Sequence, residues 1–396
     1  MRKYVSTIWL IPLLTLLSGC WDRTELNDLA LVTVMGFDKG ENNQVLVSAQ
    51  VIIPQNQSGA AVAGGGGGGS SGKRTIMRSE QGINIADALS KLQRKLPRKL
   101  FWGQCKAFIF SESLAKEGIQ EHFDFLVRHP QPRERAYLFI SKGKAADILE
   151  LYPPIERSTS EVLQELSNLQ NNLKVTMERL SIQLKSEFQS FVLPLITILP
   201  EAKSSQPFQT IAYIYGSAIF KQGKMIGEMT EKSTRGILWL KNEITEYTVT
   251  YKTPEEEGFI SLRPVKGKVK LLPTIEGEQW KMMVKVSTEG SIVQNGTNLN
   301  PLDPGLLALM ETSLENDIKE RIQKTLQEIQ HKWKADVVDF AKTFHMKYPK
   351  QWEAVKDRWN EKFPEITTDV QVEAHILRPG LVNAPGGMPI EDVKNK

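Results

Sequence analysis

The chain has 396 residues, of which 40% are hydrophobic and 24% are charged, proportions typical of a globular protein with two or three domains. Its 50 Lys and Arg residues are nearly balanced by 46 Asp and Glu residues, which gives a formal net charge of +4. A charge this small predicts no extended basic face and does not favour a nucleic-acid-binding protein.

The N-terminal residues predict an export signal. Arg2 and Lys3 form a basic start, and Tyr4 to Leu17 form an apolar run that Pro12 interrupts. The run is shorter than the roughly 20 residues that a membrane-spanning helix needs, so it reads as a cleaved signal over residues 1–19 rather than an anchor.

The four residues that close this signal, Leu17-Ser18-Gly19-Cys20, resemble the lipobox of bacterial lipoproteins. That resemblance implies that Cys20 carries an S-diacylglycerol group and an N-acyl chain, and two or more acyl chains hold a protein stably on a bilayer. The alternative is an ordinary secretory signal with a chance cysteine. If Cys20 is acylated, Cys105 has no partner for an intramolecular disulfide, and core packing must hold the fold.

The first half alternates strand and helix patterns. Apolar and β-branched runs predict strands at residues 31–37, 45–53, 75–79, 106–110 and 136–140, and helical spacing predicts helices at 84–96, 113–127, 158–173 and 177–191. Residues 55–72, with the glycine run Gly64 to Gly69, are expected to form a mobile loop. The breaker-rich segment from Pro194 to Gln209 predicts a domain boundary, so the first domain is expected at residues 20–200.

The second half changes character. Alternating residues predict strands at 211–220, 243–251, 258–263, 265–272, 279–288 and 370–376, with a helix at 230–240. Asp303 and Pro304 predict the start of a long amphipathic helix that reaches Tyr348 as one helix, or as two with a break. The sequence therefore predicts an α+β, multi-domain fold: a mixed α/β domain, then an antiparallel sheet packed with a long helix over residues 210–380. A flexible tail is expected at 381–396.

The long helix carries one apolar stripe, and a shorter helix with Trp352, Trp359 and Phe363 follows Pro349. A stripe of this kind favours packing on the chain's own sheet, although a coiled-coil partner helix stays open. The aromatic residues favour a core, and the alternative is that they line a ligand groove.

No residue pattern predicts catalysis, a metal site or a cofactor. Gly68 to Gly72 match the G-x-S-x-G spacing of hydrolases, but a glycine run cannot supply the strained strand-to-helix turn that exposes the serine. Gly67 to Lys73 imitate a phosphate-binding loop, but Arg74 stands where Ser or Thr is needed. The five histidines sit in no zinc-binding pattern. The corner from His129 to Pro132, followed by Arg133 and Arg135, is a polar turn or, alternatively, a docking corner.

Several short segments recur in the order found in a known family. They are Cys20-Trp21-Asp22 with Glu25-Leu26, Gly36-Phe37-Asp38, Trp102-Gly103-Gln104, Leu114 to Ile119, Phe125 to Pro130, Gly216 to Phe220, Trp239-Leu240, Lys347-Tyr348-Pro349, Trp352, Trp359-Asn360 and Phe363-Pro364. With the lipobox, they make the chain similar to the spore germination receptor C-subunit lipoproteins, the Ger(x)C family. The glycine-rich insertion is a departure from the family pattern.

The resemblance implies a non-enzymatic subunit of a nutrient germinant receptor. Such a protein would be anchored through Cys20 to the outer face of the spore inner membrane and would act with two integral-membrane subunits. A substrate-binding lipoprotein of an ABC-type importer would share the anchor and the size, but its two lobes should be repeated α/β units. A surface hydrolase would need a catalytic constellation that the sequence does not offer.

Overall fold

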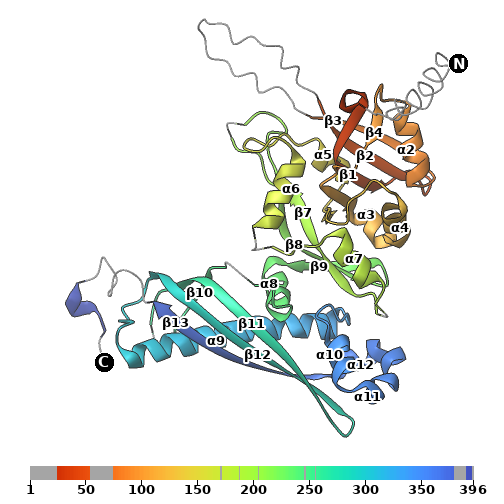
Figure 1. Cartoon of the computed structure of the whole chain (residues 1–396). Coiled ribbons are helices and arrows are strands. Elements are labelled where there is room, and N and C mark those ends of the chain that lie inside the picture. The colour runs from red at the N-terminus through yellow and green to blue at the C-terminus, as the bar shows by residue number, and fades with distance from the viewer. Residues whose placement is uncertain are drawn as a thin grey trace, which may run out of the picture.

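Two β-sheets and their helices make up the fold (Figure 1). The computed structural model describes residues 25–53, 75–169, 172–186, 188–203, 205–244, 247–254, 256–378 and 389–394. The expected signal with Cys20, the expected loop at 55–72 and residues 381–388 of the expected tail lie outside the described residues.

The first sheet has the strand order β3-β2-β1-β5-β6-β7-β8-β9, and β4 pairs with the start of β1. Its strands are β1 (Leu29–Lys39), β2 (Val45–Ile52), β3 (Thr75–Gly82), β4 (Lys99–Phe101), β5 (Ala107–Ser111), β6 (Tyr137–Ser141), β7 (Phe191–Ile198), β8 (Ala212–Lys221) and β9 (Lys224–Thr230). The central strands β1, β5, β6 and β7 are parallel, whereas β2, β3, β8 and β9 add antiparallel hairpins at both sides. Strands that alternate with helices along the chain favour a parallel centre of this kind.

Helices connect these strands and begin where capping residues allow. They are α2 (Ile85–Gln93), α3 (Glu112–Glu117), α4 (Gln120–Arg128), α5 (Ala145–Leu149), α6 (Thr159–Asn168) and α7 (Met177–Leu184), preceded by the 3-10 turn η1 (Leu26–Asp28). The side chains of Asn84, Ser111, Ser158 and Thr176 accept backbone N–H bonds at four of these N-termini. The helix expected at 113–127 is two helices, because Gly118, at φ 133°, ends α3.

The breaker-rich segment from Pro194 to Gln209, where a domain boundary is expected, begins inside a strand, because Phe191–Ile198 is β7. β6 pairs only with Leu195 and Ile196, so the missing N–H of Pro194 removes no bond of that ladder. β8 and β9 then complete the same sheet, which therefore extends to Thr230, past the expected limit at residue 200.

The second sheet has the order β10-β11-β12-β13. Its strands are β10 (Val249–Tyr251), β11 (Ile260–Glu276), β12 (Gln279–Asn295) and β13 (Thr367–Arg378). β10, β11 and β12 are antiparallel, and β13 joins β12 in parallel. The strands expected at 258–263 and 265–272 are one strand with a bulge between Arg263 and Lys266, and the strand expected at 243–251 is confined to β10.

Helix α8 (Glu231–Leu240) lies where predicted, and the predicted long helix is interrupted. α9 (Pro304–Gln327) continues as a π-helical turn (Glu328–Lys332), and α10 (Phe340–Lys347) begins after a bend. Lys334 and Asp339 adopt positive φ angles of 50° and 63°, which a continuous helix excludes. Of the two alternatives, the two-helix one is correct. The shorter elements α11 (Pro349–Glu353), η3 (Lys356–Arg358) and α12 (Trp359–Glu365) follow.

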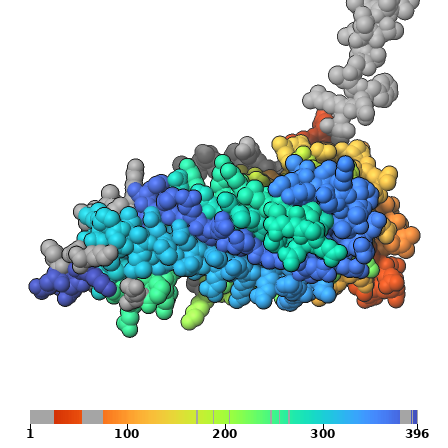
Figure 2. Space-filling view, turned by 90° about the horizontal axis from the view of Figure 1, so that it is seen from below, coloured from red at the N-terminus to blue at the C-terminus, as the bar shows by residue number. Residues whose placement is uncertain are grey.

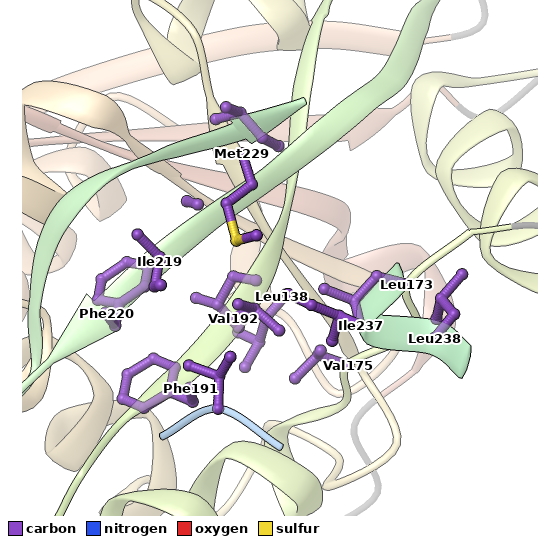
Figure 3. Packing of buried hydrophobic residues seen from close by; sticks show 14 of the residues in the cluster. Leu138, Leu173, Val175, Phe191, Val192, Ile219, Phe220, Met229, Ile237 and Leu238 are labelled. Carbon is purple, nitrogen blue, oxygen red and sulfur yellow. The ribbon is translucent and has the colours of Figure 1, made fainter. Parts of the chain in front are cut away.

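A continuous apolar core joins the two halves. Figure 3 shows part of it, where Leu138 of the first sheet lies beside Ile237 of α8, and Phe191 and Phe220 continue the cluster within the first sheet. The ring of Trp333, directly after the π-helical turn, lies against Gly227 of β9 so closely that a Cβ there would collide with it. This residue therefore packs directly on the first sheet. In Figure 2, β13 (dark blue) runs between the surface of α9 and that of the β11–β12 hairpin.

The end of the expected flexible tail is ordered. Ile390–Asp392 form a 3-10 turn, the backbone of Lys394 pairs with that of Asn298 and Asn300, and the side chain of Val393 is buried. These contacts correct the expectation of a free tail for residues 389–394.

Candidate functional site

The predicted lipid-attachment residue Cys20 lies outside the described residues. The structure shows only where the chain that follows Cys20 enters the fold. The first described residue is Glu25, which leads through η1 into β1. Five residues of extended chain span at most about 18 Å, so an anchor at Cys20 would hold this end of the first sheet close to a bilayer. None of the helices in the described ranges has the length and apolar character needed to cross a membrane.

The corner from His129 to Pro132 packs on the loop after β4. The rings of His129 and Trp102 have centroids 4.4 Å apart, and the backbone N–H of Trp102 donates to Oε1 of Gln131 over 2.9 Å. Trp102 is buried, and burial also lowers the pKa of His129. The corner therefore ties two loops together, and this favours the structural alternative for His129 and its neighbours.

Arg133 and Arg135 lie beside that corner, in a hollow of about 380 Å³ with Gln104, Lys106 and Gln164. Both arginine side chains are exposed. The hollow sits at the amino ends of β5 and β6, since Lys106 and Ala136 directly precede those strands. This geometry leaves both guanidinium groups accessible to a partner.

Cys105 forms the inner wall of the same hollow but has no reactive character. The thiol is buried, and burial raises its pKa to about 12. Because the thiolate is the nucleophile, a group with this pKa is inert at neutral pH.

The C-terminal aromatic residues form a core, and Trp352 at its margin also lines a neighbouring groove. Trp352 and Trp359 are 2% and 1% exposed, and their rings meet edge to face at a centroid distance of 5.0 Å. Phe188, which precedes β7, packs against Trp352 at 5.6 Å, so the cluster also joins the two halves. Helix α9 likewise buries its apolar stripe against the chain's own elements, chiefly β13 and α8.

A buried carboxylate that the sequence analysis missed organises this region. Asp336 accepts backbone N–H bonds from Phe340 at 3.1 Å and Ala341 at 2.6 Å, and the indole N–H of Trp359 at 3.1 Å. Burial raises its pKa to about 6, against the opposing effect of these donors. The sequence signal was present, since an Asp a few residues before a helix is a capping residue, but the helical spacing around it concealed the break.

A groove of about 460 Å³ runs between the halves beside this carboxylate. Residues of α7, α10 and α11 line it, among them Arg179, Lys342 and His345. Two of its cations are paired: Arg179 bridges to Glu243, and Lys241 bridges to Asp339 at 3.4 Å. Salt bridges therefore hold the walls of this groove together.

The expected absence of a metal site stays a prediction for the chain as a whole. Within the described ranges, no three His, Cys, Asp or Glu residues are placed to hold a metal ion. The serine motif at Gly68 to Gly72 and the phosphate-loop imitation at Gly67 to Arg74 both lie outside the described residues.

Comparisons with known proteins cover nearly the whole chain. Residues 22–198 match the family described as "Spore germination protein N-terminal domain", and residues 215–380 match "Spore germination B3/ GerAC like, C-terminal". Spore germination protein KC of Bacillus subtilis (strain 168) is 29% identical over 97% of this chain and 98% of its own length. Spore germination protein B3 of the same organism is 23% identical over 93% and 96%, and GerQC of Bacillus cereus is 21% identical over 94% and 99%.

A solved structure, the crystal structure of the GerBC protein, has the same fold. Its TM-score is 0.56 with 19% sequence identity, and the match covers 87% of this chain and 96% of that chain. The predicted fold class, a mixed α/β part followed by a sheet with a long helix, is confirmed. Because both family models match in the expected order and the relatives align over nearly their full length, the chain belongs to the Ger(x)C family of spore germination proteins.

Proposed function

We propose that this protein is the lipoprotein subunit of a nutrient germinant receptor in a bacterial spore. The observation that carries the proposal is the end-to-end match to spore germination proteins, which spans both family models and leaves no large part of the chain for another activity. In this role the protein acts with two integral-membrane receptor subunits. It has no chemical reaction of its own.

The proposed location is the outer face of the spore inner membrane, with Cys20 as the S-diacylglycerol and N-acyl attachment site. The lipobox supports this proposal, and so does the short tether, since only four residues lie between Cys20 and the first described residue. An ABC-importer lipoprotein is not favoured, because the two sheets differ in strand order and in size and are not repeated lobes.

The first test removes the anchor. Cys20→Ala takes away the acyl chains and no described core residue, so we expect normally folded protein that leaves the membrane fraction of spores and a weakened response to nutrients. The measurement is an immunoblot of membrane and soluble spore fractions after a high-salt wash. Mutant protein that stays quantitatively in the membrane fraction would refute the anchoring proposal.

The receptor role is tested by identifying the proteins that co-purify with this chain. Wild-type protein extracted from spores in mild detergent should co-purify with two polytopic membrane proteins that mass spectrometry can identify. Spores that lack this chain should respond normally to a nutrient-independent trigger and fail with the cognate nutrient. An unchanged response to every nutrient tested would remove the receptor assignment.

A further inference from the structure

A segment without any acidic residue connects α2 to β5. Residues 88–111 contain no Asp or Glu and carry six cations: Lys91, Arg94, Lys95, Arg98, Lys99 and Lys106. The near-neutral composition of the whole chain hides this local excess. A local cluster of this kind interacts with anionic surfaces whatever the total charge is.

The register of the first sheet places the segment where the chain enters the fold. β4 pairs in parallel with the start of β1, with Lys99 opposite Leu29 and Phe101 opposite Leu31. The turn at residues 94–98 is therefore at the same end of the sheet as Glu25. The Gln93 side chain fixes this turn, because its amide donates to the Arg98 carbonyl and accepts from the Leu100 N–H.

Most of these cations have no acidic partner. Lys91 pairs with Asp87 and Lys95 pairs with Glu80. Within the described ranges, the other four form no ion pair; they are Arg94, Arg98, Lys99 and Lys106. Arg94, Arg98 and Lys99 lie at the end of the sheet near Glu25, whereas Lys106 lies beside Thr33. Glu25 and Asp28 offset part of the charge at that end.

An exposed leucine accompanies the charges. The side chain of Leu26, in η1, is 69% exposed although it sits only six residues after Cys20. An apolar side chain beside cations is the combination that favours the boundary between headgroups and acyl chains.

We propose that this end of the first sheet, formed by the turn at 94–98, β4 and η1, is a membrane-contacting surface that binds anionic lipid headgroups. The proposal deepens the proposed function and rests on it, because the anchor at Cys20 brings the surface within about 18 Å of a bilayer. Tethering at this distance gives a high effective concentration, so even weak headgroup contacts suffice to set an orientation.

The proposed contact fixes which parts of the protein face away from the bilayer. Figure 1 shows α2 and β4 at the end of the molecule remote from β10, β11, β12 and β13. With the turn at 94–98 on headgroups, the second sheet and α9 project from the membrane into the aqueous space. These elements are then free to meet other proteins.

The first experiment measures binding to vesicles without the anchor. The chain from residue 20 onward, carrying Cys20→Ser and therefore unacylated, is sedimented with vesicles of phosphatidylcholine alone or of phosphatidylcholine mixed with phosphatidylglycerol. We expect binding to the mixed vesicles only, and loss of that binding as salt is raised. The triple variant Arg94→Gln, Arg98→Gln, Lys99→Gln should partition at least about tenfold more weakly.

A matched variant controls for total charge. Lys266, Lys268 and Lys270 are exposed on β11 of the second sheet, and their triple replacement by Gln changes the net charge by the same amount. This control should bind as the parent does, and near-ultraviolet circular dichroism should show that both variants are folded. Equal losses in the two variants, or equal binding to pure phosphatidylcholine, would overturn the proposal.

The second experiment measures orientation in the acylated protein. Cys105 is buried with its pKa raised to about 12, and acylation blocks Cys20, so an introduced cysteine can be labelled selectively. A fluorophore at Lys99→Cys should be quenched by lipids with a quencher in the headgroup, and one at Lys268→Cys should not. Equal quenching at both positions would refute the orientation. The vesicle experiment needs no acylation, so it tests the lipid-binding surface alone. If the anchoring proposal is wrong, spore fractionation fails while vesicle binding persists; if the surface proposal is wrong, the reverse holds.

Discussion

Buried carboxylates in this chain organise loops. Asp38 accepts the backbone N–H groups of Ala145 and Ala146 at 2.7 and 3.0 Å and so caps α5 from a neighbouring strand. Asp336 does the same for α10 and adds the indole of Trp359. Burial raises the pKa of both carboxyl groups, and both carboxylates accept backbone N–H bonds at the start of a helix. A raised pKa alone is therefore no sign of catalysis here.

The raised pKa of Asp336 makes stability depend on pH. The folded-state pKa of about 6 exceeds the ordinary value of 3.8, so the stability that this group contributes is fully present below pH 3.8 and is lost as the pH rises through 6. Relative to Asp336→Asn, the wild-type free energy of unfolding should fall by up to about 3 kcal/mol over that interval. Urea unfolding of both proteins at several pH values checks this. Parallel curves would show that Asp336 does not titrate in this range.

The burial of Trp352 predicts a large effect of its truncation. Trp352→Ala removes contacts to Phe188 and Trp359 and opens a cavity, at an expected cost of roughly 3 to 5 kcal/mol. A loss of this size is enough to unfold a marginally stable protein, so germination should fail because the protein is absent.

Abundance and response separate the two alternatives for this tryptophan. An immunoblot of spores carrying Trp352→Ala should show little protein, and a nutrient-independent trigger should still work. Normal abundance with a lost nutrient response would assign Trp352 to a functional site and contradict its place in the core. Reversing the charge of exposed Arg133 is the comparison, since that change should leave abundance normal.

At the scale of elements, the edge of the second sheet is closed by its own helix. The backbone N–H groups of Ala374 and Ile376, on the outer side of β13, donate to the carboxylates of Glu315 and Glu311 on α9 at 3.0 and 2.8 Å. An open edge would be a template for pairing with another chain. The helix therefore buries its apolar stripe and satisfies the edge of the same sheet.

The contact between Glu315 and β13 can be tested by a matched pair of substitutions. Glu315→Ala leaves the Ala374 N–H without its acceptor and should cost about 1 to 3 kcal/mol, whereas Glu315→Gln keeps an acceptor and should cost less. Denaturant unfolding measures the costs, and amide hydrogen exchange at Ala374 should quicken in the alanine variant only. If both variants match the wild type, water replaces the carboxylate at this edge.

Local signals predicted elements well where the chemistry was local. The N-cap at Asn84 and the Asp303-Pro304 pair mark the starts of α2 and α9, because capping needs only residues three apart. Strand partners and interruptions depend on distant contacts. The apolar spacing ran through residues 333–339 although Asp336 stops the helix there, and nothing in the sequence shows that β13 joins β12 in parallel.

The site could be predicted only in part for the same reason. The lipobox is a contiguous pattern that four residues suffice to identify. Asp336, by contrast, gains its role only through its contacts with α10 and with Trp359, which the sequence does not show. The overall composition could not reveal the basic surface, because acidic residues elsewhere in the chain balance its charge. Only the register that sets Lys99 opposite Leu29 brings it to the end of the sheet nearest the expected anchor.

At the scale of the whole molecule, the first sheet continues past residue 200, where the first domain is expected to end. β8 and β9 follow that limit in the chain but finish the first sheet, and α8 then packs on both β8 and α9. The sequence families also divide near residue 200, which shows that a division of the sequence into families and a division of the fold into sheets need not coincide.

This continuity predicts where the chain can be cut. A fragment of residues 21–200 keeps β7 but loses β8, so the fully buried side chains of Phe191 and Leu193 and the free edge of β7 become exposed. We expect it to aggregate, because an apolar open edge pairs with other chains. A fragment of residues 21–243 adds β8, β9, α8 and Glu243, the partner of Arg179, and should be monomeric with a cooperative thermal transition. Size-exclusion chromatography and circular dichroism of both fragments measure this. If the shorter fragment proves monomeric and unfolds cooperatively, the first domain ends near residue 200 and the last two strands are an addition to a sheet that is stable without them.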